Sequence, residues 1–139
     1  MKIITLASGS KGNTSYIEVG NTRFLIDIGI TYRHLLERLA EIDRSIDDID
    51  ALLITHTHSD HIKGVGVLAR RYGVPIYATE GTIRQMKSMS SLGTIDEGLY
   101  HVVHADEDFF IGDMKVEPFA ISHDAAEPVA YRFECGEKS

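Results

Sequence analysis

The chain has 139 residues, a length that suits one domain with a real hydrophobic core. Hydrophobic residues make up 43% and charged residues 25%, which is typical of an ordinary globular domain. The formal net charge of −7 excludes capture of a polyanion by the overall field, so such a partner would need a local basic patch or bound metal. Cys135 stands alone, which excludes an intrachain disulfide and fits a reducing compartment. We read no signal peptide or membrane span, and we expect a cytoplasmic protein.

The first half of the chain alternates short apolar strands with an amphipathic helix. The Gly20–Asn21 pair predicts a hairpin turn between the second and third strands. Thr31 is the expected N-cap of a helix that runs to about Ala40. The apolar face of that helix would contain Leu35, Leu36 and Leu39. The predicted strands of this half are Ile3–Leu6, Ser15–Val19, Arg23–Asp27 and Ala51–Ile54.

The second half begins with another amphipathic helix and then turns to β-structure. This helix would start near Ile62 and end at Gly73 and Pro75. Its apolar face would contain Val65, Leu68, Ala69 and Tyr72. A further helix is expected over 81–89, whereas 90–99 shows no clear pattern. The predicted strands are Ile76–Ala78, Phe109–Ile111, Met114–Phe119 and Val129–Cys135, so the class is mixed α/β.

A cluster of metal-binding residue types follows the buried strand at Ala51–Ile54. Imidazole and carboxylate groups are preferred zinc ligands and also suit manganese and iron. His56 and His58 are two residues apart, so in an extended segment both can face one ion. The expected turn into a helix then brings Asp60 and His61 toward a second ion near the helix N-terminus. Histidine is 7 of 139 residues, so three at such positions by chance has odds of roughly one in ten thousand.

The sequence Thr-His-Thr-His-Ser-Asp-His after an apolar strand resembles the signature of the metallo-β-lactamase superfamily. Asp27 matches the first motif of that superfamily, and His123 in Ile-Ser-His-Asp matches its third. The segments LASGSKGNTSYIEV, FLIDIG, LLITHTHSDHIKGVGVLARRYGVPIYAT and ISHDAAEPVAYRF resemble its YycJ/WalJ-like branch of bacterial metal-dependent hydrolases in particular. The resemblance covers nearly the whole chain and is least clear over 90–107.

This resemblance implies a role for each matching residue. The first ion would be held by His56, His58 and His123. The second ion would be held by Asp60 and His61, and Asp27 would orient the site from the outer shell. Asp60 and Asp27 are therefore the predicted catalytic residues, and the expected cofactors are two divalent ions, zinc or manganese. We interpret His34, His101 and His104 as solvated histidines rather than ligands.

The resemblance also implies a fold, namely one αβ half of an αββα sandwich. Its mixed sheet would carry the helices at Thr31 and Ile62 on one face, and its other face would be apolar. Residues 1–139 would form one domain, C-terminally truncated, because Gly136–Glu137 predicts a hairpin turn without a second strand. In that superfamily a bridging Asp and a last His complete the second metal site, and both would lie beyond Ser139. We expect self-association of such a fragment and little activity from it alone.

The expected function is metal-dependent hydrolysis, most simply of phosphodiester bonds in nucleic acid. Divalent ions activate water at neutral pH and neutralise phosphate oxygens, which lets an acidic protein bind DNA locally. Two alternatives stay open from the sequence. Another hydrolase of the superfamily would act on thioesters, lactones or β-lactams, and a cytoplasmic location disfavours the last. A metal-binding module without catalysis is the alternative from a different class.

Overall fold

The computed structural model describes residues 2–7, 14–55, 62–89, 92–112, 114–120 and 129–135. These residues form a six-stranded sheet in the order β1-β2-β3-β4-β5-β6 and a three-stranded sheet in the order β7-β8-β9. The first sheet consists of β1 (Lys2–Ala7), β2 (Thr14–Val19), β3 (Thr22–Ile26), β4 (Ala51–Leu53), β5 (Ile76–Thr79) and β6 (Tyr100–Val103). The second consists of β7 (Phe109–Ile111), β8 (Met114–Ala120) and β9 (Val129–Cys135). The helices are α1 (Tyr32–Glu41), α2 (Ile62–Tyr72) and α3 (Glu80–Lys87), with short 3-10 turns at Ile46–Asp48 and Glu97–Leu99.

The first sheet is mixed, as predicted. β1, β2 and β3 pair antiparallel, and Gly20 with φ 57° forms the tight turn between the last two. β3, β4, β5 and β6 pair parallel, and each helix is the crossover between two neighbouring parallel strands. Leu52 and Leu53 are both fully buried, which fits a central parallel strand covered on both faces. The carboxyl ends of β3, β4 and β5 therefore meet at one edge of the sheet.

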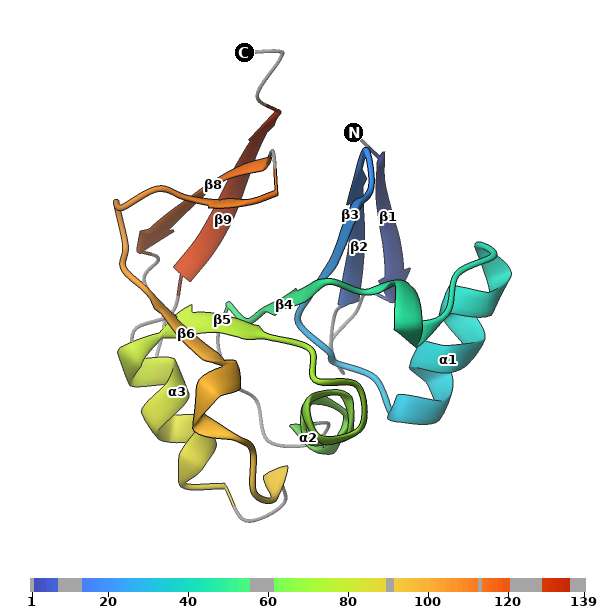
Figure 1. The fold of residues 1–139 in the computed structure, drawn as a ribbon, viewed down its shortest axis with the longest axis horizontal. Helices are drawn as coiled ribbons and strands as arrows, with labels where there is room; N and C mark the ends of the chain where they lie inside the picture. The colour runs from blue at the N-terminus through green and yellow to red at the C-terminus, as the bar shows by residue number, and fades with distance from the viewer. Residues whose placement is uncertain are drawn as a thin grey trace.

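All three helices pack on one face of this sheet, as predicted for the two that begin near Thr31 and Ile62. α2 and α3 lie below β4 and β5 in Figure 1, while β8 and β9 lie above them. Thr31 caps α1 by accepting a hydrogen bond from the His34 amide, 3.2 Å away. The predicted helix faces are wrong at one position each, because Leu36 is 39% exposed and Tyr72 is 38% exposed. Among the described residues, no helix is long and apolar enough to cross a membrane.

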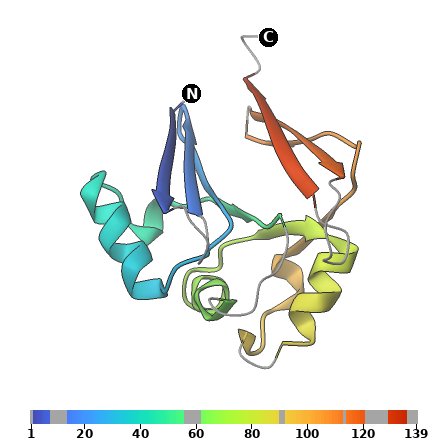
Figure 2. The same ribbon diagram turned by 180° about the vertical axis from the view of Figure 1, so that it is seen from behind.

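The other face of the first sheet is covered by the second sheet, which the view from behind also shows (Figure 2). Phe24 and Leu53 on the first sheet belong to one buried cluster with Met114 and Val116 on the second. This inner face is apolar, as expected, but the expectation that a truncated chain would leave it uncovered is wrong, because β7, β8 and β9 pack across it. The molecule has three layers: helices, mixed sheet and antiparallel sheet.

Candidate metal centre

The candidate site lies at the carboxyl edge of the parallel strands, where open α/β sheets usually bind their ligands. β3 ends at Ile26 and is followed by Asp27, and β4 ends at Leu53 and is followed by Ile54 and Thr55. The segment 56–61, which contains four of the predicted ligands, connects this end of β4 to the start of α2. The topology thus leads directly from a buried strand end into the predicted metal ligands.

Asp27 links the ends of β3 and β4 through hydrogen bonds. Its amide donates to the Leu53 carbonyl oxygen at 2.7 Å, and its carboxylate accepts from the Thr55 amide at 2.8 Å and the Thr55 hydroxyl at 2.5 Å. Asp27 has φ 59°, a left-handed conformation that aspartate tolerates better than most residues. Its carboxylate therefore fixes the last described residue before the predicted ligands.

The environment of Asp27 favours a cation nearby. Burial raises the pKa of Asp27 to about 6, although both hydrogen bonds from Thr55 act in the opposite direction. Within the described part of the chain, this carboxylate accepts hydrogen bonds from two neutral groups, the amide and the hydroxyl of Thr55, and it forms no ion pair there. A buried carboxylate without a counter-charge is costly. A divalent ion bound beside it would offset that cost, so the residues present fit a metal site.

The segment after Asp27 is held between β2 and α2. The Gly29 amide donates to the hydroxyl of Thr14, a fully buried residue, at 3.0 Å. Thr14 pairs with Ala7 across the β1–β2 ladder, so the two residues that flank 8–13 are neighbours here. On the other side, a Cβ on Gly64 of α2 would lie 3.2 Å from the Ile28 side chain. The first turn of α2 therefore approaches this segment closely.

The second sheet reaches the same edge through β9. Ala120, at the end of β8, pairs with Val129, at the start of β9, and these two residues flank the segment that contains His123. Tyr131 lies two residues further along β9, and its hydroxyl donates to the Ile54 carbonyl oxygen at 2.8 Å. The described residues that flank 56–61 and 121–128 are thereby held together across the two sheets.

The structure describes one of the predicted site residues but not the predicted metal ligands. Asp27 lies at the edge described above, whereas the predicted ligands His56, His58, Asp60, His61 and His123 lie outside the described residues. His34, His101 and His104 are exposed, as expected. Within the described ranges, no group of three or more His, Cys, Asp or Glu residues is placed to hold an ion.

Three residues at this edge were not singled out from the sequence. Thr55 is the first residue of the predicted metal motif, so its position next to the predicted ligands could be inferred from the sequence. Its hydrogen bond to Asp27 could not. Thr14 carried no signal beyond its neighbourhood to a Gly-rich loop. Tyr131 looked like one more apolar position of an alternating strand, because its partner Ile54 is 77 residues away.

Comparisons with known proteins show which sequences this chain resembles. A family model described as a β-lactamase superfamily domain matches residues 22–139. The chain is 45% identical over 138 residues to a Streptococcus pneumoniae protein named exodeoxyribonuclease WalJ, covering 99% of this chain and 51% of that protein. It is 40% identical over 128 residues to exodeoxyribonuclease YycJ of Bacillus anthracis, covering 92% of this chain and 48% of that protein. The chain thus spans about half the length of these relatives.

Metallo-β-lactamases are among the solved structures that share this fold. The Rm3 metallo-β-lactamase matches with a TM-score of 0.76 at 14% identity, over 96% of this chain and 54% of that one. A subclass B3 metallo-β-lactamase from a soil metagenome, MEM-A1, matches with a TM-score of 0.74 at 17% identity, over 96% of this chain and 55% of that one. These likenesses show the fold and confirm the expected half of the sandwich.

Proposed function

The chain belongs to the β-lactamase superfamily domain family, and from that premise we propose that it carries the metal site of a hydrolase that cleaves phosphodiester bonds in nucleic acid. The observation that carries this proposal is the place of Asp27. Its buried carboxylate binds Thr55 at the edge where the flanks of the predicted ligand segments meet. The site therefore combines a negative outer shell with two segments rich in metal-ligating residue types.

We assign the ligands as the sequence predicts. His56, His58 and His123 hold the first divalent ion, zinc or manganese, and Asp60 and His61 contribute to the second. When bound, such ions supply Lewis-acid charge and activate water at neutral pH. Asp27 acts from the outer shell, because its two bonds to Thr55 fix the direction in which the chain enters 56–61.

A nucleic acid substrate is consistent with an acidic chain under one condition. The net charge of −7 repels a polyanion at long range, so phosphate must be attracted locally. Bound divalent ions are the largest local positive charges in a site of this kind. The two relatives described above are both named exodeoxyribonucleases, and that favours DNA as the substrate class. We also place the protein in the cytoplasm, where its lone cysteine stays reduced.

The test uses one ligand variant and one matched control. His58→Ala removes a predicted ligand, and His34→Ala removes an exposed histidine of α1 that is remote from the motif in sequence. Metal-stripped chains are titrated with Zn²⁺ and Mn²⁺, and end-labelled DNA is then incubated with each loaded chain. We expect metal binding that H34A retains and H58A loses, and any metal-dependent shortening of DNA should be lost in H58A in the same way. DNA degradation that persists in H58A would contradict the assigned site.

A metal-binding module without catalysis is the second candidate, and the length comparison favours it. The match covers only 51% of the length of its relative WalJ, so about half of that protein has no counterpart in these 139 residues. Metal binding that depends on His58, without turnover of DNA, would support this candidate. Turnover of a thioester or lactone instead of DNA would support a different hydrolase of the same family.

We further propose that the chain self-associates through the second sheet. β9 pairs with β8 on one side, and no described strand pairs with its other side. Phe110 and Phe119, on β7 and β8, are 62% and 43% exposed. An open strand edge beside exposed aromatic side chains is a common route to association between copies.

A further inference from the structure

Tyr131 is the described side chain that links the two strands leading to the predicted ligands. Its hydroxyl lies 2.8 Å from the Ile54 carbonyl oxygen and 3.4 Å from the Tyr77 carbonyl oxygen. Ile54 precedes His56 by two residues, and Tyr131 follows the segment 121–128 by three. One hydroxyl thus joins the end of β4, on the first sheet, to the start of β9, on the second.

The Ile54 carbonyl needs such a partner because of where β4 stops. The ladder between β4 and β5 ends at the pair Leu53–Tyr77, and the Ile54 amide donates to the Tyr77 carbonyl oxygen at 2.9 Å. Ile54 is only 3% exposed, so an unpaired carbonyl there would be costly. A hydroxyl delivered from the opposite sheet satisfies it and fixes the backbone where the chain leaves the ladder.

The surroundings of Tyr131 keep its hydroxyl protonated, so that it can donate a hydrogen bond. Its ring packs against the buried cluster between the sheets, and it pairs with buried Pro118 on β8. Burial, with a smaller effect from the negative charge of Asp27, holds the pKa of Tyr131 well above its ordinary range. The hydroxyl therefore stays protonated at neutral pH.

We propose that Tyr131 is a positioning residue of the metal centre, whose bond to the Ile54 carbonyl fixes the strand end before His56 against the strand start after His123. This inference rests on the proposed ligand set. Ligands from two different sheets must reach one ion within a few tenths of an ångström, so the relative position of the strand ends sets the affinity. Supporting residues behind metal ligands typically change metal affinity about 10–100-fold when they are lost.

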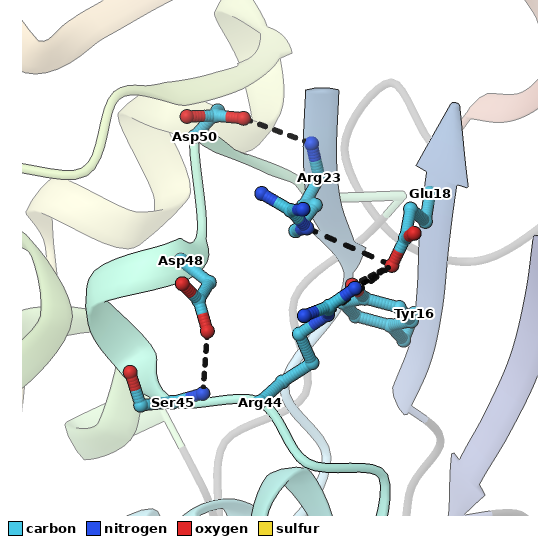
Figure 3. Close-up of polar contacts among 7 residues, drawn as sticks. All are labelled: Tyr16, Glu18, Arg23, Arg44, Ser45, Asp48 and Asp50. Atoms are coloured by element: carbon cyan, nitrogen blue, oxygen red, sulfur yellow. Dashed lines mark hydrogen bonds and ion pairs between the residues drawn. The ribbon is translucent and has the colours of Figure 1, made fainter. Parts of the chain in front are cut away.

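The test removes one hydroxyl and compares it with another. Tyr131→Phe keeps the ring in the cluster between the sheets and loses only the hydroxyl bonds to the Ile54 and Tyr77 carbonyl oxygens. The control is Tyr16→Phe, because Tyr16 is fully buried and its hydroxyl donates to Glu18 at 2.6 Å and accepts from Arg44 at 3.1 Å (Figure 3). Both variants lose a tyrosine hydroxyl with hydrogen bonds, but only one of them touches the end of β4. Circular dichroism of the metal-free chains checks that both are folded.

The readouts are Zn²⁺ affinity, by competition with a chromophoric chelator, and the visible spectrum of the Co²⁺-loaded chain. We expect Y131F to bind Zn²⁺ about tenfold more weakly and to change the Co²⁺ spectrum, whereas Y16F matches the wild type in both. Unchanged affinity and spectrum in Y131F, or equal losses in the two variants, would overturn the role of Tyr131 while leaving the proposed function in place. A wild-type chain that binds neither ion would overturn the proposed function and this role together.

A second measurement needs no variant. Amide hydrogen exchange of the wild-type chain is compared with and without Zn²⁺. We expect the metal to slow exchange at Ile54 and Thr55 and, to a similar degree, at Ala130 and Tyr131, because one hydroxyl couples these strand ends. Protection of the first pair without the second would count against the coupling.

Discussion

At the scale of single residues, Asp27 makes the stability of the metal-free chain depend on pH. An aspartate in an unfolded chain has a pKa of about 4, and burial raises the pKa of Asp27 to about 6 in the fold. The fold therefore holds this proton more tightly than the unfolded chain does. The resulting stabilisation is fully present below about pH 4 and is lost as the pH rises through about 6.

Asp27→Asn isolates this contribution, because asparagine does not titrate and tolerates φ 59°. In the presence of EDTA, we expect the free energy of unfolding of the wild type to fall relative to D27N between about pH 4 and pH 7. The difference should be on the order of 2–3 kcal/mol. Urea denaturation of both chains across this range measures it, and parallel pH profiles would show that Asp27 is not desolvated.

The same residue shows what local sequence can and cannot predict. Asp27 was recognisable because it ends an apolar run and matches a family motif. Its left-handed backbone and its bonds to Thr55 were not, since they depend on β4 lying beside β3. The hydrogen bond of Tyr131 is harder still to predict, because no local pattern in the 139 residues indicates which group on the other sheet its hydroxyl will contact.

At the scale of elements, α2 owes its position to Gly66. A Cβ on this residue would lie 2.3 Å from the Leu92 carbonyl oxygen, a backbone atom that cannot turn aside. The Arg70 guanidinium, one turn later on α2, donates to the same oxygen at 2.8 Å. Because α2 follows the predicted ligands directly, this contact also fixes one end of the candidate site.

We expect Gly66→Ala to lower the free energy of unfolding by roughly 1–3 kcal/mol relative to Gly98→Ala. The control is matched because a Cβ on Gly98, in the 3-10 turn at Glu97–Leu99, would meet nothing closer than the Asp96 carboxylate at 3.5 Å. Both changes reduce the entropy of the unfolded chain equally. Urea denaturation measures the free energy of unfolding of both variants. Equal values would mean that the backbone at Leu92 moves aside without cost.

Periodicity predicted which elements form but not how far each apolar face extends. α1 buries Leu35 and Leu39 in the core, yet Leu36 is 39% exposed and lies outside that cluster. Tyr72 is the last position of the apolar pattern of α2. Its hydroxyl shares an exposed hydrogen bond of 3.0 Å with the Tyr32 hydroxyl. An amphipathic tyrosine satisfies the helical spacing and still belongs to the surface.

At the scale of the whole molecule, layering explains why the candidate site lies at this edge. The helices hold the parallel strands in register from one side, and the second sheet presses on them from the other. The flanks of two segments that carry predicted ligands and lie far apart in the sequence are then held together by the bond between Tyr131 and Ile54. The sequence motifs predict convergence of these segments by resemblance alone, since the cover of β7, β8 and β9 over the first sheet had no local signature.

The outer face of that second sheet gives the last prediction, self-association of the chain. Phe119 on β8 pairs in register with Ala130 on β9, the strand whose other side has no partner among the described strands. Sedimentation velocity over a range of concentrations should show the wild type shifting from monomer to dimer. Phe119→Glu places a charge beside this edge and should keep the chain monomeric. Val102→Glu on β6, where the native side chain is 49% exposed against 43% for Phe119, should leave the association unchanged. A wild type that stays monomeric throughout, or two variants that dissociate alike, would show that copies of this chain do not meet through the second sheet.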